Sequence, residues 1–236
     1  MSKIAAWSVH VFTATGLLAA FMGLLAVSAG EYRLAMLWIL ISLVIDGVDG
    51  TFARLARVEE VLPRVSGKQI DYVIDFFSYA ILPAYFFYAA IDLAYWPRLL
   101  CTFAMLLSGA LYYGLEGMVS ADGKHFVGFP VMWNMVVYLL VFVTPGLPGW
   151  ALVGIVLAFA LMHFLPILFA YPSRGGRWWV ATLLATVAFI SSAVFNVWYY
   201  PEPSPLWRAV CGVSVAYYAL LAAVDTFGGG GGARVQ

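Results

Sequence analysis

The chain has 236 residues, and 64% of them are hydrophobic, against roughly 45–50% in soluble proteins. A soluble globule of this size could not cover that much apolar surface, so lipid is the expected solvent for most of the chain. The formal net charge is zero, with 12 basic and 12 acidic residues. This balance excludes a nucleic-acid partner, because a nucleic-acid-binding module needs a basic face. Cys101 and Cys211 lie inside apolar runs and indicate neither a disulfide framework nor a metal site.

Apolar runs long enough for helices recur along the whole chain. A helix that crosses a bilayer needs about 20 apolar residues. Eight runs are expected to do so, at Ile4–Ala29, Leu34–Arg57, Ile70–Leu93, Leu99–Val119, Val131–Val143, Trp150–Tyr171, Trp178–Trp198 and Leu206–Asp225. The first run exceeds the 7–15 apolar residues of a signal-peptide core, so we expect a retained helix. The sequence predicts an all-α integral membrane protein, a bundle of about eight transmembrane helices.

The positions of the Lys and Arg residues predict the orientation. With the amino terminus in the cytoplasm, the inner side holds Lys3, Arg54, Arg57, Arg64, Lys68, Lys124, Arg174, Arg177 and Arg234. The outer side then holds Arg33, Arg98 and Arg208. Cytoplasmic loops carry an excess of positive residues, so we expect a cytoplasmic amino terminus.

Four acidic residues lie inside apolar runs, where an Asp costs about 2.5–3.5 kcal/mol at mid-bilayer depth and usually marks a site. Asp46 and Asp49 are three apart in the second run, and Asp71 and Asp75 are four apart at the start of the third. Residues at these spacings share one helix face. Two antiparallel helices would therefore present two carboxylates each to one cleft.

Four facing carboxylates repel one another unless cations lie between them. Hard Mg²⁺ or Mn²⁺ ions take carboxylate oxygens together with substrate phosphates, and two such metals form a clamp for phosphoryl transfer. The small residues Gly50, Ala53 and Gly67 leave room for a ligand, and Arg54 can pair with phosphate oxygens. Two other interpretations are ion pairs of the Asp residues with Arg54, Arg57 and Lys68, and the cation pathway of a transporter. A transporter would need acids deeper along the path and helices broken near the midplane, and neither is evident.

The same residues form a motif. The chain reads Asp46-Gly47-Val48-Asp49-Gly50-Thr51-Phe52-Ala53-Arg54, then twelve residues, then Gly67-x3-Asp71-x3-Asp75. This pattern resembles the D-x2-D-G-x2-A-R-x8-G-x3-D-x3-D motif of the CDP-alcohol phosphatidyltransferases. The longer gap is similar to the bacterial phosphatidylcholine synthase branch of that family. Three further stretches fit this branch: Trp7 to Gly16, Gly128-Phe129-Pro130-x2-Trp133-Asn134, and Pro166 followed by Tyr171-Pro172-Ser173-Arg174.

The resemblance implies an enzyme that transfers a phosphatidyl group from CDP-diacylglycerol to choline. Asp46, Asp49, Asp71 and Asp75 would hold two divalent cations, Mn²⁺ or Mg²⁺, and Asp75 would also be the catalytic base. Asp46, Gly50, Ala53, Arg54 and Gly67 would bind the CDP group. Residues 1–227 would be a single transmembrane catalytic domain and 228–236 a flexible Gly-rich tail. The protein would be a multi-pass protein of the bacterial inner (cytoplasmic) membrane, with its active site on the cytoplasmic side. The sequence does not set the oligomeric state, and a homodimer stays open.

Choline is a quaternary ammonium ion, and aromatic faces attract such ions. Candidate substrate-binding residues near the expected inner side are His10, Tyr112, Tyr113, Glu116, Phe129, Trp133, Asn134, Tyr171 and Arg174. Core packing, or a belt at the membrane surface, is an alternative role for each aromatic residue, and a structural role is an alternative for His10. Other alcohol acceptors, such as serine, inositol phosphate and glycerol phosphate, also stay open.

The segment between Arg54 and Gly67 is about one helical turn longer than in most of the family. Pro63 disfavours helix just before it, so we expect the second helix to end near Leu62 or earlier. The extra turn should alter the rim of the site and leave the geometry of the Asp residues unchanged.

Overall fold

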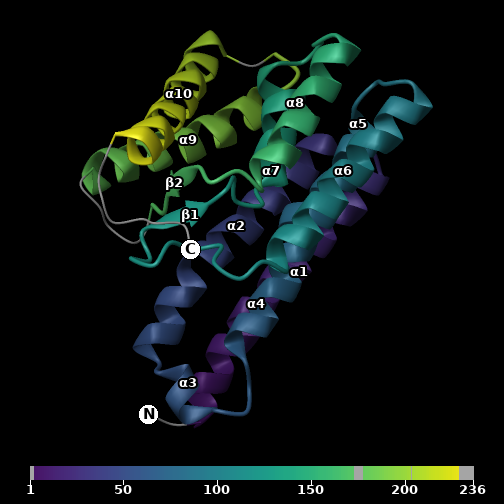
Figure 1. Ribbon diagram of the computed structural model, residues 1–236. Helices are drawn as coiled ribbons and strands as arrows, with labels where there is room; N and C mark the ends of the chain where they lie inside the picture. The colour runs from purple at the N-terminus through teal and green to yellow at the C-terminus, as the bar shows by residue number, and fades with distance from the viewer. Residues whose placement is uncertain (1–2, 173–177, 203, 229–236) are drawn as a thin grey trace. The chain divides into compact units, whose positions relative to one another are not determined.

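The computed structural model describes residues 3–172, 178–202 and 204–228 (Figure 1). The chain divides into two compact units, Met1–Ala90 and Ile91–Gln236, which are described separately. Ser173 and Arg174 of the expected third motif lie outside the described residues, and so do residues 229–236 of the expected tail.

The first unit is built on a pair of long helices. Helix α1 (Lys3–Ser28) and helix α2 (Tyr32–Leu55) are joined by a short turn, in which Gly30 has a φ of +75°. The two helices pack along each other, and α1 also packs against the run that follows (Figure 1). Ala19, Ala20 and Gly23 form part of the buried face of α1, and such small residues let helix backbones approach closely.

The third run is one continuous helix with a change of winding. Helix α4 (Gly67–Asp75) leads into the π-helical segment η1 (Phe76–Ile81) and then into α5 (Leu82–Ala90). Pro83 has no backbone N–H and its ring would clash with the carbonyl four residues earlier, that of Tyr79. A π-helix pairs each carbonyl with the N–H five residues on, and Leu82 donates to the Phe77 carbonyl in this way. Pro83 thus accounts for the π winding, which begins directly after Asp75.

The long connection between α2 and α4 packs against α1. Helix α2 ends at Leu55, as the sequence predicts, and a short helix α3 (Val58–Val61) follows. Ala56, Val58 and Leu62 form a buried cluster with Ala6 of α1. The connection is therefore part of the packed structure of this unit.

The second unit contains the helices α6 (Tyr95–Tyr113), α7 (Trp133–Tyr138), α8 (Gly149–Met162), α9 (Trp179–Tyr199) and α10 (Pro205–Phe227), with the π-helical segment η2 (Leu139–Val143) directly after α7. Helix α6 packs on α8, and α9 on α10. Two three-residue strands, β1 (His125–Val127) and β2 (Leu168–Ala170), pair antiparallel. Helix α10 packs against β2, where Thr226 Oγ1 accepts a hydrogen bond from the Leu168 N–H at 2.9 Å.

Two predicted helices end earlier than expected. The fourth, expected to reach Val119, ends at Tyr113, because Gly114 follows and the chain then turns at Gly117 with a φ of +85°. The sixth, expected to reach Tyr171, ends at Met162. Pro166 lacks the N–H that a helix needs and disfavours helix in the residue before it. The chain beyond it forms β2 instead. The sequence predicted neither β1 nor β2.

All eight predicted runs contain a helix. By length and composition, five helices among the described residues are long and apolar enough to cross a bilayer: α1, α2, the run Gly67–Ala90, α9 and α10. The apolar helices Trp133–Val143 and Gly149–Met162 are shorter. The chain is thus an α-helical, multi-pass membrane protein, and the count of eight spans stays a prediction.

Two glycines with the same backbone conformation allow a test of packing in the second unit. Gly128 has a φ of +82°, and a Cβ there would lie 2.0 Å from the His163 carbonyl oxygen, whereas at Gly117, with a φ of +85°, nothing lies within 4 Å. Gly117→Ala should cost only backbone strain, about 1–2 kcal/mol. Gly128→Ala should cost about 1–3 kcal/mol more, from overpacking. Thermal unfolding in detergent measures both, and equal losses would contradict the packing argument.

Candidate active site

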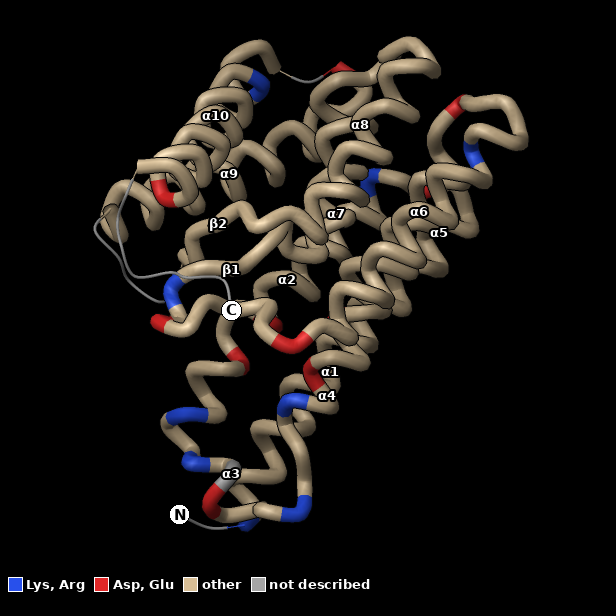
Figure 2. Tube along the Cα trace, viewed as in Figure 1, with Lys and Arg blue, Asp and Glu red and all other residues tan. Residues whose placement is uncertain are grey.

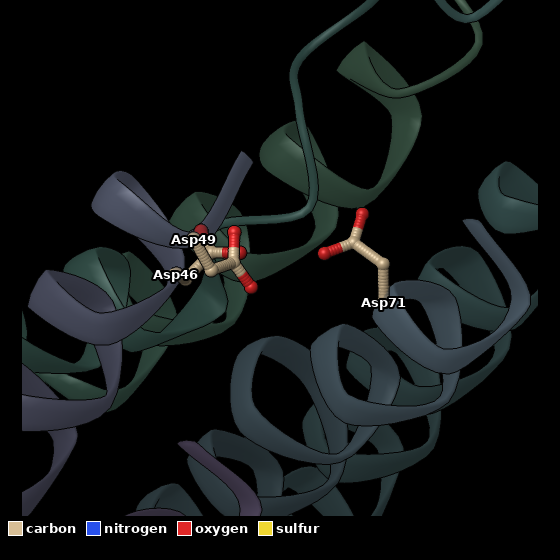
Figure 3. A group of neighbouring side chains, drawn as sticks. All are labelled: Asp46, Asp49 and Asp71. Atoms are coloured by element: carbon tan, nitrogen blue, oxygen red, sulfur yellow. The ribbon is translucent and has the colours of Figure 1, made fainter. Parts of the chain in front are cut away.

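Three of the four predicted Asp residues place their carboxylates together. Asp46 and Asp49 project from α2, and their carboxylates face that of Asp71 on α4 (Figure 3). One ligand oxygen from each lies within 4.8 Å of the others. The spacing of three on α2 sets the first two carboxylates on one face, and the packing of both α2 and α4 on α1 brings the third opposite them.

The fourth residue, Asp75, lines the same pocket. Its carboxyl group lies near that of Asp46, and Tyr79 donates a hydrogen bond of 2.7 Å to Asp46 Oδ2. The pocket is lined by residues of α1, α2, α4 and η1: Thr13, Gly16, Ser42, Ile45, Asp46, Asp49, Asp71, Ile74, Asp75, Ser78 and Tyr79. All four Asp residues of the motif therefore belong to one site within the first unit.

The donor set fits a divalent cation. Carboxylate and hydroxyl oxygens are hard ligands of the kind that Mg²⁺ and Mn²⁺ prefer, and no Lys or Arg stands among the described residues that line the pocket. Asp49 is only 7% exposed, and a buried negative charge is costly without a positive partner. The three clustered carboxylates could bind a cation, which would supply that partner.

The basic side chains that the ion-pair interpretation requires contact other groups. The Arg54 guanidinium donates to Thr51 Oγ1 at 3.0 Å, and Arg57 lies 3.9 Å from the Glu60 carboxylate. The Lys68 ammonium lies 5.3 Å from the centre of the Tyr72 ring. The structure therefore gives no support to ion pairing as the reason for the Asp residues.

The small residues of the motif have different surroundings. A Cβ at Gly50 would have only the Arg54 Nη1 within 4 Å, at 3.4 Å, and a Cβ at Gly67 only the Cε1 atom of His10, at 3.5 Å. Gly50 thus leaves open space beside the Arg54 side chain. Ala53 packs against the cluster of α1 and α3.

His10 of α1 lies next to Gly67 of α4. Its side chain is buried, and its Nε2 has no hydrogen-bond partner among the described residues. The structure therefore brings together the predicted residues His10 and Gly67, which are 57 positions apart in the sequence.

Three predicted choline-binding residues of the second unit form an aromatic core. Tyr112, Phe129 and Trp133 surround His163, with ring centres 5.4, 5.6 and 5.4 Å from the imidazole. The Tyr112 hydroxyl donates to the Val127 carbonyl at 3.0 Å, and His163 Nδ1 lies 2.6 Å from the Phe129 carbonyl oxygen. These contacts support a packing role. The sequence did not identify His163 as a candidate, because this histidine belongs to no motif with a recognisable spacing.

The other candidates of this unit are more dispersed. Asn134 Oδ1 accepts from the Met135 N–H at 2.9 Å, and the ring of Tyr171 stacks on Phe126 at 4.5 Å. Tyr113 ends α6, and Glu116 is exposed in the turn beyond it.

Sequence reasoning also missed residues of the first site. Tyr79 continues the four-residue spacing of Gly67, Asp71 and Asp75, and this periodicity could have identified it. Thr13, which lines the same pocket, lies in the stretch that resembles the first motif of the branch. Ser42 and Ser78 carried no such signal.

The helices and the site define an α-helical membrane protein with a buried carboxylate cluster suited to a divalent cation. No family model matches the chain. The chain is 37% identical over 210 residues to a phosphatidylcholine synthase of Brucella melitensis, an overlap of 89% of this chain and 74% of that protein. It is 34% identical to that of Rhizobium johnstonii (96% and 92%) and 30% identical to that of Borreliella burgdorferi (94% and 93%). The chain belongs to the phosphatidylcholine synthase family, a branch of the CDP-alcohol phosphatidyltransferases, as the motifs indicate.

The cluster predicts that Asp49→Ala removes a cation ligand. Mn²⁺ affinity should fall by more than roughly 10–100-fold, which is the loss typical when a residue that hydrogen-bonds a metal ligand is removed. Isothermal titration of the detergent-solubilised protein with Mn²⁺ measures it. Glu31→Ala, which removes an exposed acid near the other end of α2, is the matched control and should bind Mn²⁺ as the wild type does. Equal affinity in both variants would contradict the assignment of Asp49.

Proposed function

We propose that this protein transfers a phosphatidyl group from CDP-diacylglycerol to choline in a divalent-cation-dependent reaction that yields phosphatidylcholine and CMP. The observation that carries the proposal is the convergence of the motif's carboxylates, with ligand oxygens of Asp46, Asp49 and Asp71 within 4.8 Å of one another. Membership of the phosphatidylcholine synthase family supports the choice of choline as acceptor.

Asp46, Asp49, Asp71 and Asp75 would together hold two cations, Mn²⁺ or Mg²⁺. Bound cations would neutralise charge on the diphosphate and on the departing phosphate. Gly50 and Gly67 leave space beside Arg54 and His10. In our proposal this space admits the CDP group, whose phosphate oxygens Arg54 contacts.

Asp75 acts as the base in this scheme. The hydroxyl oxygen of choline attacks the phosphorus that carries the diacylglycerol, and the bond from that phosphorus to the oxygen of CMP breaks. The hydroxyl proton passes to the Asp75 carboxylate. A carboxylate suits this role because it can accept the proton of a hydroxyl group that lies within hydrogen-bond reach.

The positions of the Lys and Arg residues support a proposal for the side of the membrane on which the site lies. In the first unit, Lys and Arg residues gather around α3, where α1 begins and α2 ends (Figure 2). Arg33 lies at the opposite end, at the start of α2. The positive-inside rule supports our proposal that the amino terminus and the active site face the cytoplasm, and that the protein belongs to the bacterial inner membrane.

The choice of alcohol has alternatives within the wider family. A phosphorylated acceptor such as inositol phosphate or glycerol phosphate needs basic residues near the site in addition to Arg54, and no Lys or Arg is among the described residues that line the pocket. This favours an acceptor that carries no phosphate. The purified protein should incorporate labelled choline in the presence of CDP-diacylglycerol and Mn²⁺ or Mg²⁺. Incorporation of serine or a phosphorylated alcohol in place of choline would refute choline as the acceptor. Uptake of labelled choline into vesicles that contain the protein, without formation of phosphatidylcholine, would indicate a transporter.

Asp75→Asn tests the base. The amide keeps the size of the side chain and accepts no proton, so turnover should fall by about 10²–10⁴-fold while CDP-diacylglycerol binding partly survives. Turnover is measured with labelled choline, and binding with labelled nucleotide. Asp92→Asn, in the loop beyond α5, is the control and should retain activity. Turnover of Asp75→Asn within about tenfold of the wild type would rule out the assignment.

A further inference from the structure

Tyr79 makes a contact to the carboxylate cluster that the proposed chemistry does not use. The side chain is buried, with 6% exposure, and its hydroxyl donates to Asp46 Oδ2 at 2.7 Å. A hydroxyl-to-carboxylate bond of this length is charge-assisted, and such bonds are roughly twice as strong as neutral ones. Tyr79 therefore fixes one oxygen of the Asp46 carboxylate.

The backbone around Tyr79 is held in place by neighbouring contacts. Tyr79 lies in η1, whose winding is imposed by Pro83, and Ser78 beside it lies 3.3 Å, Oγ to Oγ, from Ser42 of α2. Ser42 in turn donates to the Gly16 carbonyl of α1 at 3.1 Å. These contacts tie η1 to the two helices that build the pocket, so the hydroxyl has a defined position relative to Asp46.

We infer that Tyr79 is a positioning residue that holds the Asp46 carboxylate in a one-oxygen binding mode suited to an octahedral cation. The inference rests on the proposed cation site. With Oδ2 engaged by the hydroxyl, Asp46 presents its other oxygen to the metal. Mg²⁺ demands near-ideal octahedral geometry, whereas Ca²⁺ accepts one- or two-oxygen carboxylate binding in a flexible shell. Tyr79 would thus favour the small octahedral cations over Ca²⁺.

Tyr79→Phe tests this role, because it removes the hydroxyl and keeps the ring that fills the space. Mn²⁺ binding to the solubilised protein, with no substrate present, is followed by the electron paramagnetic resonance of free Mn²⁺, and Ca²⁺ binding by competition. We expect Mn²⁺ affinity to fall about 10–100-fold, as it does when other residues that hydrogen-bond a metal ligand are removed. Ca²⁺ affinity should fall by a smaller factor.

The matched control is Tyr32→Phe, which also removes a tyrosine hydroxyl from the first unit. That hydroxyl donates to the Ala89 carbonyl at 2.8 Å and does not line the pocket. Both cation affinities of this variant should equal those of the wild type. If Tyr79→Phe is unstable without metal, the dependence of its melting temperature on Mn²⁺ and on Ca²⁺ gives the two affinities by linkage.

A change in Mn²⁺ affinity below about tenfold, or equal losses for Mn²⁺ and Ca²⁺, would overturn the inference. So would a Tyr32→Phe variant that loses as much Mn²⁺ affinity as Tyr79→Phe. The binding measurement uses no alcohol and no nucleotide, so a wrong choice of acceptor in the proposed function leaves its result unchanged. A wild-type protein that binds no Mn²⁺ would overturn both the cation site and the role of Tyr79.

Discussion

Mutual repulsion of carboxylates is the constraint on which the first unit depends. Four Asp residues line one pocket between helices that are apolar along most of their length, where like charges interact strongly because the local dielectric constant is low. Packing of α1 against α2 and α4 holds these groups together. The clustered carboxylates could hold a metal ion, which would offset this negative charge.

The helices and the carboxylate cluster could be predicted because each depends on local spacing. A run of about 20 apolar residues specifies a helix whatever its neighbours are, and carboxylates three or four apart lie on one face without knowledge of the fold. The predicted end of α2 near Leu62 or earlier followed from Pro63 alone. The family motif then added chemical roles that spacing by itself does not carry.

Features that depend on contacts distant in the sequence could not be predicted. The pairing of β1 with β2 joins segments about 40 residues apart, and neither strand has more than three residues to display an alternating pattern. The aromatic ring cluster around His163 was interpreted as a set of candidate substrate contacts, since sequence cannot separate a ring that faces a ligand from a ring that faces another ring.

The packing of the α2–α4 connection has a consequence for the start of the chain. Ala56, Val58 and Leu62 bury Ala6 of α1, and His10 lies one turn further along that helix, beside Gly67. These residues of the connection thus pack against the first turns of α1, the helix that carries His10. The length of this connection and the position of the first helix are therefore linked in this protein.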